Sequence, residues 1–126
     1  MNSLAHDSGA YGRAQTAART PRSIEYEVIA RITRRLKAAA ATRESDYPGF
    51  VAAVSDNLRL WAVLGTDVAA SGNELPTPLR ARIFYLFEFT EQHSRKLLAG
   101  EPVSADILIE INVAVLRGLR GEGAGA

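Results

Sequence analysis

The chain has 126 residues, of which 47% are hydrophobic and 23% charged, with a formal net charge of +1 and no cysteine. This length supports one domain with a real core, and the lack of cysteine excludes disulfides, thiolate metal sites and cysteine nucleophiles. No run of 18 apolar residues could span a membrane, and the first twenty residues lack the apolar core of a secretory signal. We therefore expect a cytoplasmic protein without a general electrostatic attraction to nucleic acid or membrane.

The N-terminal segment, residues 1–19, is small and polar, and we expect it to be flexible or to form a short helix around Tyr11. A helical bundle is expected over residues 20–119. Its first helix begins at Thr20-Pro21, with Thr20 as the cap, and runs through the alanines at 38–41. Its core stripe repeats every four residues, at Ile24, Val28, Ile32 and Leu36.

A second helix is expected from about Pro48 to about Ala70, after a link that contains Ser45, Asp46 and Gly49. Gly65 interrupts its apolar stripe and would let another helix approach closely. The other members of the stripe are Val51, Val54, Leu58, Trp61 and Val68.

The segment Thr77–Gly100 predicts the helix around which the bundle is organised, with Thr77 as cap and Gly100 as stop. It has apolar groups on two faces, so it must be covered on two sides. Phe87 belongs to the first face, with Ile83 and Leu86, whereas Tyr85 and Phe89 point nearly the opposite way. We expect Tyr85 and Phe89 to lie in the core of the bundle; if exposed, they become the first candidates for a partner surface.

The last helix is expected from Pro102 and the cap Ser104 to about Leu119. Its main apolar face carries Leu108, Ile111, Val115 and Leu119, and a second apolar side carries Ile109, Val113 and Leu116. The glycine-rich tail, residues 120–126, is expected to be disordered. No segment alternates with a period of two residues. The sequence thus predicts an all-α fold, a small single-domain bundle of four main helices.

The sequence offers no catalytic or cofactor site, and we expect neither an enzyme nor a cofactor. Its two histidines, His6 and His93, are too few and too far apart for a recognisable metal site. Ser94 follows His93 directly, but adjacent helical residues diverge by about 100°, so the pair cannot act as nucleophile and base.

Two asparagines stand on otherwise apolar faces. Asn57 borders the Leu60 and Trp61 side of its helix, and Asn112 interrupts the stripe of the last helix. A buried amide without a partner costs about 1–3 kcal/mol, so each should make specific hydrogen bonds. Either they fix helix register and pin loops, or they make polar contacts to a partner.

The best candidate for phosphate contact is a basic cluster in and just after the first helix of the bundle, made up of Arg31, Arg34, Arg35, Lys37 and Arg43. Arg31, Arg34 and Arg35 lie at i, i+3 and i+4 and share a face. The alternative is that basic residues simply favour the C-terminal part of a helix. No aromatic residues are interleaved there for base stacking.

Four segments in this order resemble the FlaF family of flagellar biosynthesis regulators: T-P-R-S-I-E, D-N-L-R-L-W, L-P-T-P-L-R and I-E-I-N-V-A-V-L-R-G-L. The resemblance runs from Tyr11 to Leu119, and nothing before Tyr11 contributes to it. The matching positions are Pro21, Arg22, Glu25, Asn57, Leu60, Trp61, Leu75, Pro76, Arg80, Asn112, Gly118 and Leu119.

The resemblance implies a cytoplasmic, non-enzymatic protein that promotes flagellin synthesis or secretion and acts with a second regulator, FlbT. One mechanism is a flagellin-binding export chaperone or adaptor, whose apolar groove holds an amphipathic helix of flagellin. The alternative is post-transcriptional regulation of flagellin mRNA translation, with FlbT or with RNA on the Arg31, Arg34 and Arg35 face. A homodimer joined through the aromatic faces is a third possibility.

Overall fold

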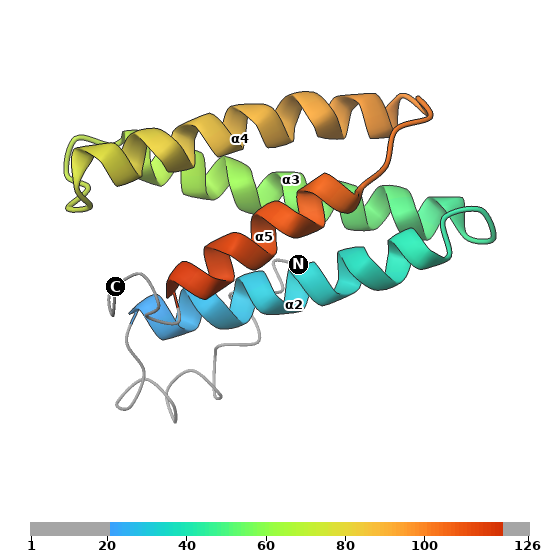
Figure 1. Cartoon of the computed structure of the whole chain (residues 1–126), viewed down its shortest axis with the longest axis horizontal. Helices are drawn as coiled ribbons and strands as arrows, with labels where there is room; N and C mark the ends of the chain where they lie inside the picture. The colour runs from blue at the N-terminus through green and yellow to red at the C-terminus, as the bar shows by residue number, and fades with distance from the viewer. Residues whose placement is uncertain (1–20, 120–126) are drawn as a thin grey trace.

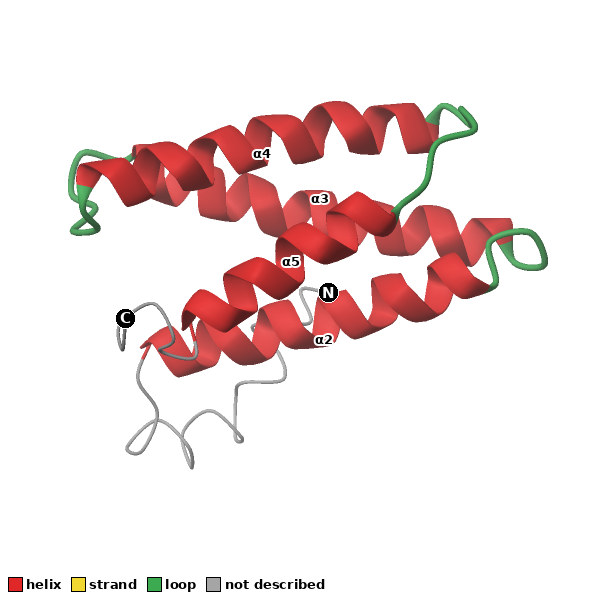
Figure 2. Ribbon diagram, in the orientation of Figure 1, coloured by secondary structure: helices red, strands yellow, loops and turns green. Residues whose placement is uncertain are grey.

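A computed structural model describes residues 21–119 of the chain, with the side chains of residues 25–118. The described residues form four helices, α2 (Pro21–Ala41), α3 (Tyr47–Ala69), α4 (Thr77–Leu98) and α5 (Asp106–Leu119), and contain no strand (Figure 1). Loops alone connect these helices, as Figure 2 shows. The predicted all-α fold is confirmed. The expectations for residues 1–19 and 120–126, and the Thr20 cap, lie outside the described residues.

Most of the predicted helix ends have an identifiable cause. Asp46 caps α3, since its carboxylate accepts a hydrogen bond from the Gly49 N–H at 3.0 Å. Gly100 adopts φ +80° just after α4, and the Gly100 and Glu101 N–H groups donate to the carbonyls of Leu97 and Lys96. This is a Schellman motif, in which glycine takes the left-handed position without a Cβ penalty.

Two expected caps have different outcomes. The hydroxyl of Ser104 accepts a hydrogen bond from the Asp106 N–H at 3.0 Å, at the start of α5. The Thr77 cap was wrong: Thr77 is already the first helical residue, Pro76 occupies the cap position, and no side chain caps this end. The Thr77 hydroxyl instead accepts a hydrogen bond from Arg80.

The helix at the centre of the bundle is α3, and the prediction that α4 takes this place was wrong. α3 packs along both α2 and α4, whereas α4 does not approach α2 and meets α5 only slightly. Seven residues of α3 are buried, among them Trp61 and Gly65, but only Thr90, Ser94 and Leu97 of α4. The many aromatic residues of α4 suggested a central helix; most of them point away from α3.

The apolar core is concentrated at one end of the molecule, where the α2–α3 and α4–α5 loops lie. All four described helices contribute to it, and α4 does so through Leu97. The cluster consists of Leu36, Phe50, Ala53, Val54, Leu97, Ala105 and Leu108. At the opposite end α5 crosses toward α2, while α4 stays beside α3, so that α4 and α5 diverge (Figure 1).

Candidate functional site

The inward stripe of α4 is covered along only half of its length. Thr90, Ser94 and Leu97 are 0% exposed. The same stripe continues toward the N-terminus of α4 through Leu86, Ile83 and Leu79, because all six residues fall within one helical face. There Ile83 and Leu86 are half-buried, and Leu79 is 42% exposed. The inward surface of α4 is therefore buried toward the C-terminus of the helix and open toward its N-terminus.

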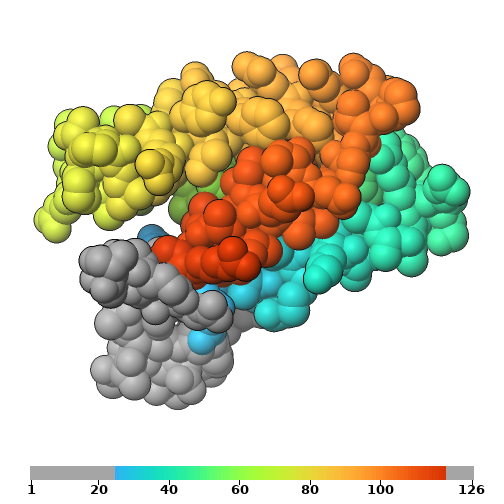
Figure 3. Space-filling view, viewed as in Figure 1, coloured from blue at the N-terminus to red at the C-terminus, as the bar shows by residue number. Residues whose placement is uncertain are grey.

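The opposing surface belongs to α5. Ile109 packs against the core beside the end of α4, and Val113 and Leu116 continue its face by one and two turns. Val113 and Leu116 are half-buried. Figure 3 shows the surface hollowed between the N-terminal half of α4 and α5, with part of α3 at the bottom.

We call this feature the α4–α5 groove and define it by the apolar residues on its two walls. By helical period these are Leu79, Ile83 and Leu86 of α4, and Ile109, Val113 and Leu116 of α5. The open part of the α4 stripe, from Leu79 to Leu86, spans about 10 Å at 1.5 Å per residue. Two turns of a partner helix would cover it.

Tyr85 and Phe89 lie outside this wall, on the side of α4 that points away from Ile83 and Leu86. Tyr85 is 65% exposed, so its predicted place in the core was wrong. Phe89 is half-buried, and its ring stacks on that of His93 with centroids 5.7 Å apart. Phe84 meets Phe87 edge-on at 5.7 Å. Phe84 and Phe89 thus pack on neighbouring rings of α4, whereas the Tyr85 ring remains in solvent.

Phe87 is the exception, because it fits against Gly65 of α3. A Cβ built on Gly65 would lie 2.6 Å from Cδ2 of Phe87, which is too close for any side chain. The prediction that Gly65 admits a neighbouring helix is confirmed. The face of α4 that carries Phe87 packs on α3 through this contact.

Trp61, Asn57 and Asn112 lie in the interior and not on a docking surface. Asn112 accepts a hydrogen bond from the Trp61 indole N–H at 2.8 Å. Its amide group donates to Oδ1 of Asn57 at 2.8 Å and to Oγ1 of Thr33 at 3.1 Å. Asn57 and Asn112 are 0% exposed and Trp61 is 1% exposed.

This network supports the first interpretation of the asparagines, that they fix helix register. Their partners are side chains of other helices rather than the loop carbonyls considered from the sequence. Sequence reasoning missed Thr33, the third member, because threonine is unremarkable within a helix. Thr33 also donates to the carbonyl of Ile29 at 2.6 Å, so its hydroxyl uses both its donor and an acceptor position.

The basic candidates on α2 are only partly available for a ligand. Arg34 and Arg35 are exposed and Arg31 is half-buried. Arg35 forms an ion pair with Asp56 of α3 at 3.1 Å, and Asp56 also binds Arg59. Of the family-matched candidates at the start of α2, Glu25 is exposed, whereas the side chains of Pro21 and Arg22 lie outside the description.

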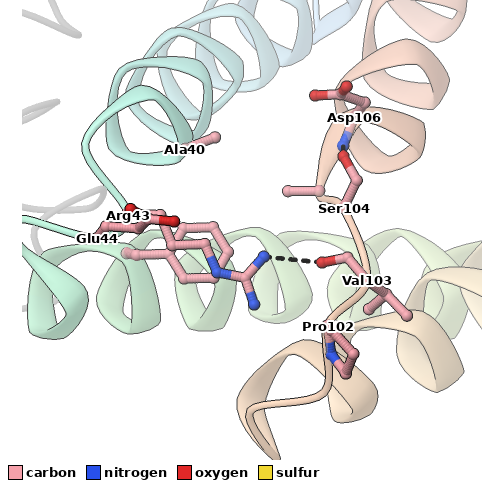
Figure 4. Close-up of a pocket in the computed structure, with 9 residues that line it drawn as sticks. Ala40, Arg43, Glu44, Pro102, Val103, Ser104 and Asp106 are labelled. Atoms are coloured by element: carbon pink, nitrogen blue, oxygen red, sulfur yellow. Dashed lines mark hydrogen bonds between the residues drawn. The ribbon is translucent and has the colours of Figure 1, made fainter.

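A second hollow lies at the loop end of the molecule, and Arg43 bridges it (Figure 4). Its guanidinium donates to the carbonyls of Val103 at 2.7 Å and Glu101 at 3.2 Å. The guanidinium carbon lies 4.6 Å from the centroid of the Phe50 ring. Arg43 therefore joins the α2–α3 loop to the α4–α5 loop, and its charge is already used within the protein. The sequence placed Arg43 only among basic residues and missed this role.

Residues 21–119 contain no group of three histidine, cysteine or acidic side chains that could hold a metal ion. Within the same range, no helix is both long and apolar enough to cross a bilayer.

Fold and site together define a small four-helix protein, over its described residues, whose main surface feature is an apolar groove beside a weakly covered helix. The chain matches the family described as Flagellar protein FlaF over residues 7–119 and belongs to that family. The match confirms the resemblance noted from the sequence. Comparison with curated proteins and with solved structures finds no match.

Proposed function

We propose that this flagellar protein is an export chaperone or adaptor that holds an amphipathic helix of flagellin in the α4–α5 groove. The observation that carries the proposal is the half-covered stripe of α4, fully buried at Thr90 and Leu97 but open at Leu79. A monomer leaves such an apolar surface open chiefly where something else covers it. Membership in the FlaF family gives the flagellar context.

The size and chemistry of the groove suit one helix of a partner. An amphipathic helix places apolar residues at i, i+3, i+4 and i+7 along one side, and such a row fits a groove with two apolar walls.

The test is retention of purified cognate flagellin by the purified, full-length protein. We expect wild type to retain flagellin, and Leu79→Asp to reduce retention about tenfold or more, because a buried anchor typically contributes 2 kcal/mol or more. Leu79 is well exposed in the free protein, so the helix content measured by circular dichroism should remain unchanged.

Val63 provides a matched control. It is the most exposed large hydrophobic side chain among the described residues, at 67%. It lies about 160° around α3 from Gly65, which faces α4. Val63→Asp introduces the same charge as Leu79→Asp but outside the groove, and it should retain flagellin normally. Equal losses in both variants, or no retention by wild type, would contradict the proposal.

Three alternatives predict different outcomes. Translational regulation through RNA predicts binding to the flagellin leader RNA that Arg31→Glu with Arg34→Glu weakens, while Arg35 keeps its ion pair with Asp56. Direct action through FlbT predicts retention of FlbT instead of flagellin. A homodimer closed over the groove predicts a dimer in sedimentation that Leu79→Asp dissociates.

A further inference from the structure

We infer that α4 is a hinged wall: its N-terminal half opens away from α3 and α5 about an anchor at its C-terminal end. The observations behind this inference concern how unevenly α4 is attached. These observations concern the free protein. Only the consequence that opening of α4 widens the groove for a partner rests on the proposed function.

The anchor consists of contacts in the last two turns of α4. Leu97 is completely buried in the core cluster. The hydroxyl of Tyr47 donates to the Leu97 carbonyl at 3.4 Å, and Nε2 of His93 lies 2.7 Å from the Ser104 carbonyl. Since a carbonyl oxygen only accepts, Nε2 of His93 carries the proton in this contact.

The inward stripe of α4 carries buried polar groups that lack partners, Thr90 next to this anchor and Ser94 within it. The hydroxyls of Thr90 and Ser94 are buried and form no hydrogen bond. Within residues 25–118, every buried side-chain nitrogen or oxygen without a partner belongs to α4, as Thr90, Ser94 and Arg80 do, or to Asn57 on α3. A buried polar group without a partner disfavours the closed state, because water would satisfy that group once it is exposed.

Asn57 lies across from these hydroxyls. α3 and α4 are antiparallel neighbours, and Phe87 lies against Gly65. From this contact, two turns toward the N-terminus of α3 correspond to two turns toward the C-terminus of α4. Asn57 therefore lies at the level of Ser94. Thr90 and Ser94 share the inward stripe of α4, and Asn57 stands level with Ser94 on α3. The carbonyl oxygen of Asn57 is bonded to Asn112 within the buried network, so only its Nδ2 lacks a partner.

The N-terminal half of α4 runs beside α3 but contributes no buried residue. No residue from Thr77 to Phe89 is buried, although Phe87 lies against Gly65. The low-stability elements of a protein are those with few buried apolar contacts. The N-terminal half of α4 meets this description, while α2, α3 and α5 are joined by the buried network.

Opening of this half would widen the α4–α5 groove and expose Ile83 and Leu86 to an incoming helix. A partner that binds the open state shifts the population toward it. The unpaired hydroxyls then lower the free energy needed to open this half of α4. Stronger attachment of α4 would weaken or slow binding of the partner.

Hydrogen exchange on the free, full-length protein tests the hinge without any partner. We expect amides of residues 79–90 to exchange at least about tenfold faster, relative to their intrinsic rates, than those at the centres of α2 and α3. Thr90→Val removes an unpaired hydroxyl and keeps the shape of the side chain. It should slow exchange in this half of α4 by about fivefold.

Thr33→Val is the matched control, because it makes the same change at a buried threonine that has partners. It should speed exchange in α2, α3 and α5. Ser94→Ala provides a second variant if Thr90→Val does not fold. Uniform protection across all four helices, or faster exchange in α4 of both Thr90→Val and Ser94→Ala, would overturn the hinge. Loss of flagellin retention with these exchange results intact would instead count against the proposed function alone.

Discussion

The indole N–H of Trp61 donates to Oδ1 of Asn112 at 2.8 Å, inside the protein and across 51 positions of the chain. This bond joins α3 to α5, and the amide group of Asn112 then reaches Thr33 on α2. One side chain thus connects three helices. Because α5 is short and its burial on α2 and α3 is otherwise apolar, these directional bonds fix where along its neighbours α5 sits.

Asn112→Leu should lower the free energy of unfolding by about 2–4 kcal/mol. The substitution keeps the branched shape of the side chain but leaves the Trp61 N–H and the Asn57 carbonyl oxygen without their partner in the interior. Chemical denaturation followed by Trp61 fluorescence measures the change. Gln92→Leu on the exposed side of α4 makes a similar change with no buried bond to lose. A loss no larger than that of Gln92→Leu would refute the role given to Asn112.

Gly65→Ala and Gly118→Ala should change stability in opposite directions. A Cβ at Gly65 meets the ring of Phe87, and overpacking of this kind costs about 1–3 kcal/mol. Nothing lies within 4 Å of a Cβ at Gly118, in the last turn of α5. There alanine gains part of the helix preference of about 1 kcal/mol over glycine.

Thermal denaturation of both alanine variants provides the measurement. If Gly65→Ala were as stable as Gly118→Ala, the close approach of α4 to α3 at this point would be wrong. The hinge makes a further claim: Gly65→Ala should speed exchange in the N-terminal half of α4 more than in α2, since Phe87 is the main contact of that half.

Arg43→Lys should destabilise the protein by about 1–2 kcal/mol although it conserves the charge. Lysine lacks the planar fork that sets separate N–H groups on the Val103 and Glu101 carbonyls, and it loses the planar contact with Phe50. Chemical denaturation measures the loss, with Arg34→Lys as the control at an exposed position. Equal stability of the two variants would show that the Arg43 bridge contributes nothing.

The sequence predicted the helices well, because their signals are local. Asp46, Ser104 and Gly100 act on backbone groups within a few residues, and the stripes of α2, α3 and α5 follow from helical period alone. The role of Gly65 was also predicted correctly, because a glycine within an apolar stripe indicates the close approach of another helix.

The order of the helices in space was not predictable in the same way. The aromatic residues of α4 suggested a helix covered on all sides, but Phe89 stacks on His93 and Tyr85 remains in solvent. Which helix is central depends on long-range packing, and no local pattern reports it. The partners of Asn112 and the use of Arg43 likewise join segments more than fifty positions apart, which a single sequence does not reveal.

Binding of flagellin should depend only weakly on salt if the groove is the site. The walls at Leu79, Leu86 and Leu116 are apolar, and burial of apolar surface releases no counterions. Raising the salt concentration from about 0.05 M to about 0.2 M should change the dissociation constant by less than about threefold. Binding to a polyphosphate backbone through several arginines would weaken by orders of magnitude over the same range. Titration calorimetry at the two salt concentrations separates these results, and a negative heat-capacity change would accompany the apolar mode. A steep salt dependence that Arg31→Glu and Arg34→Glu abolish would move the site from the groove to α2.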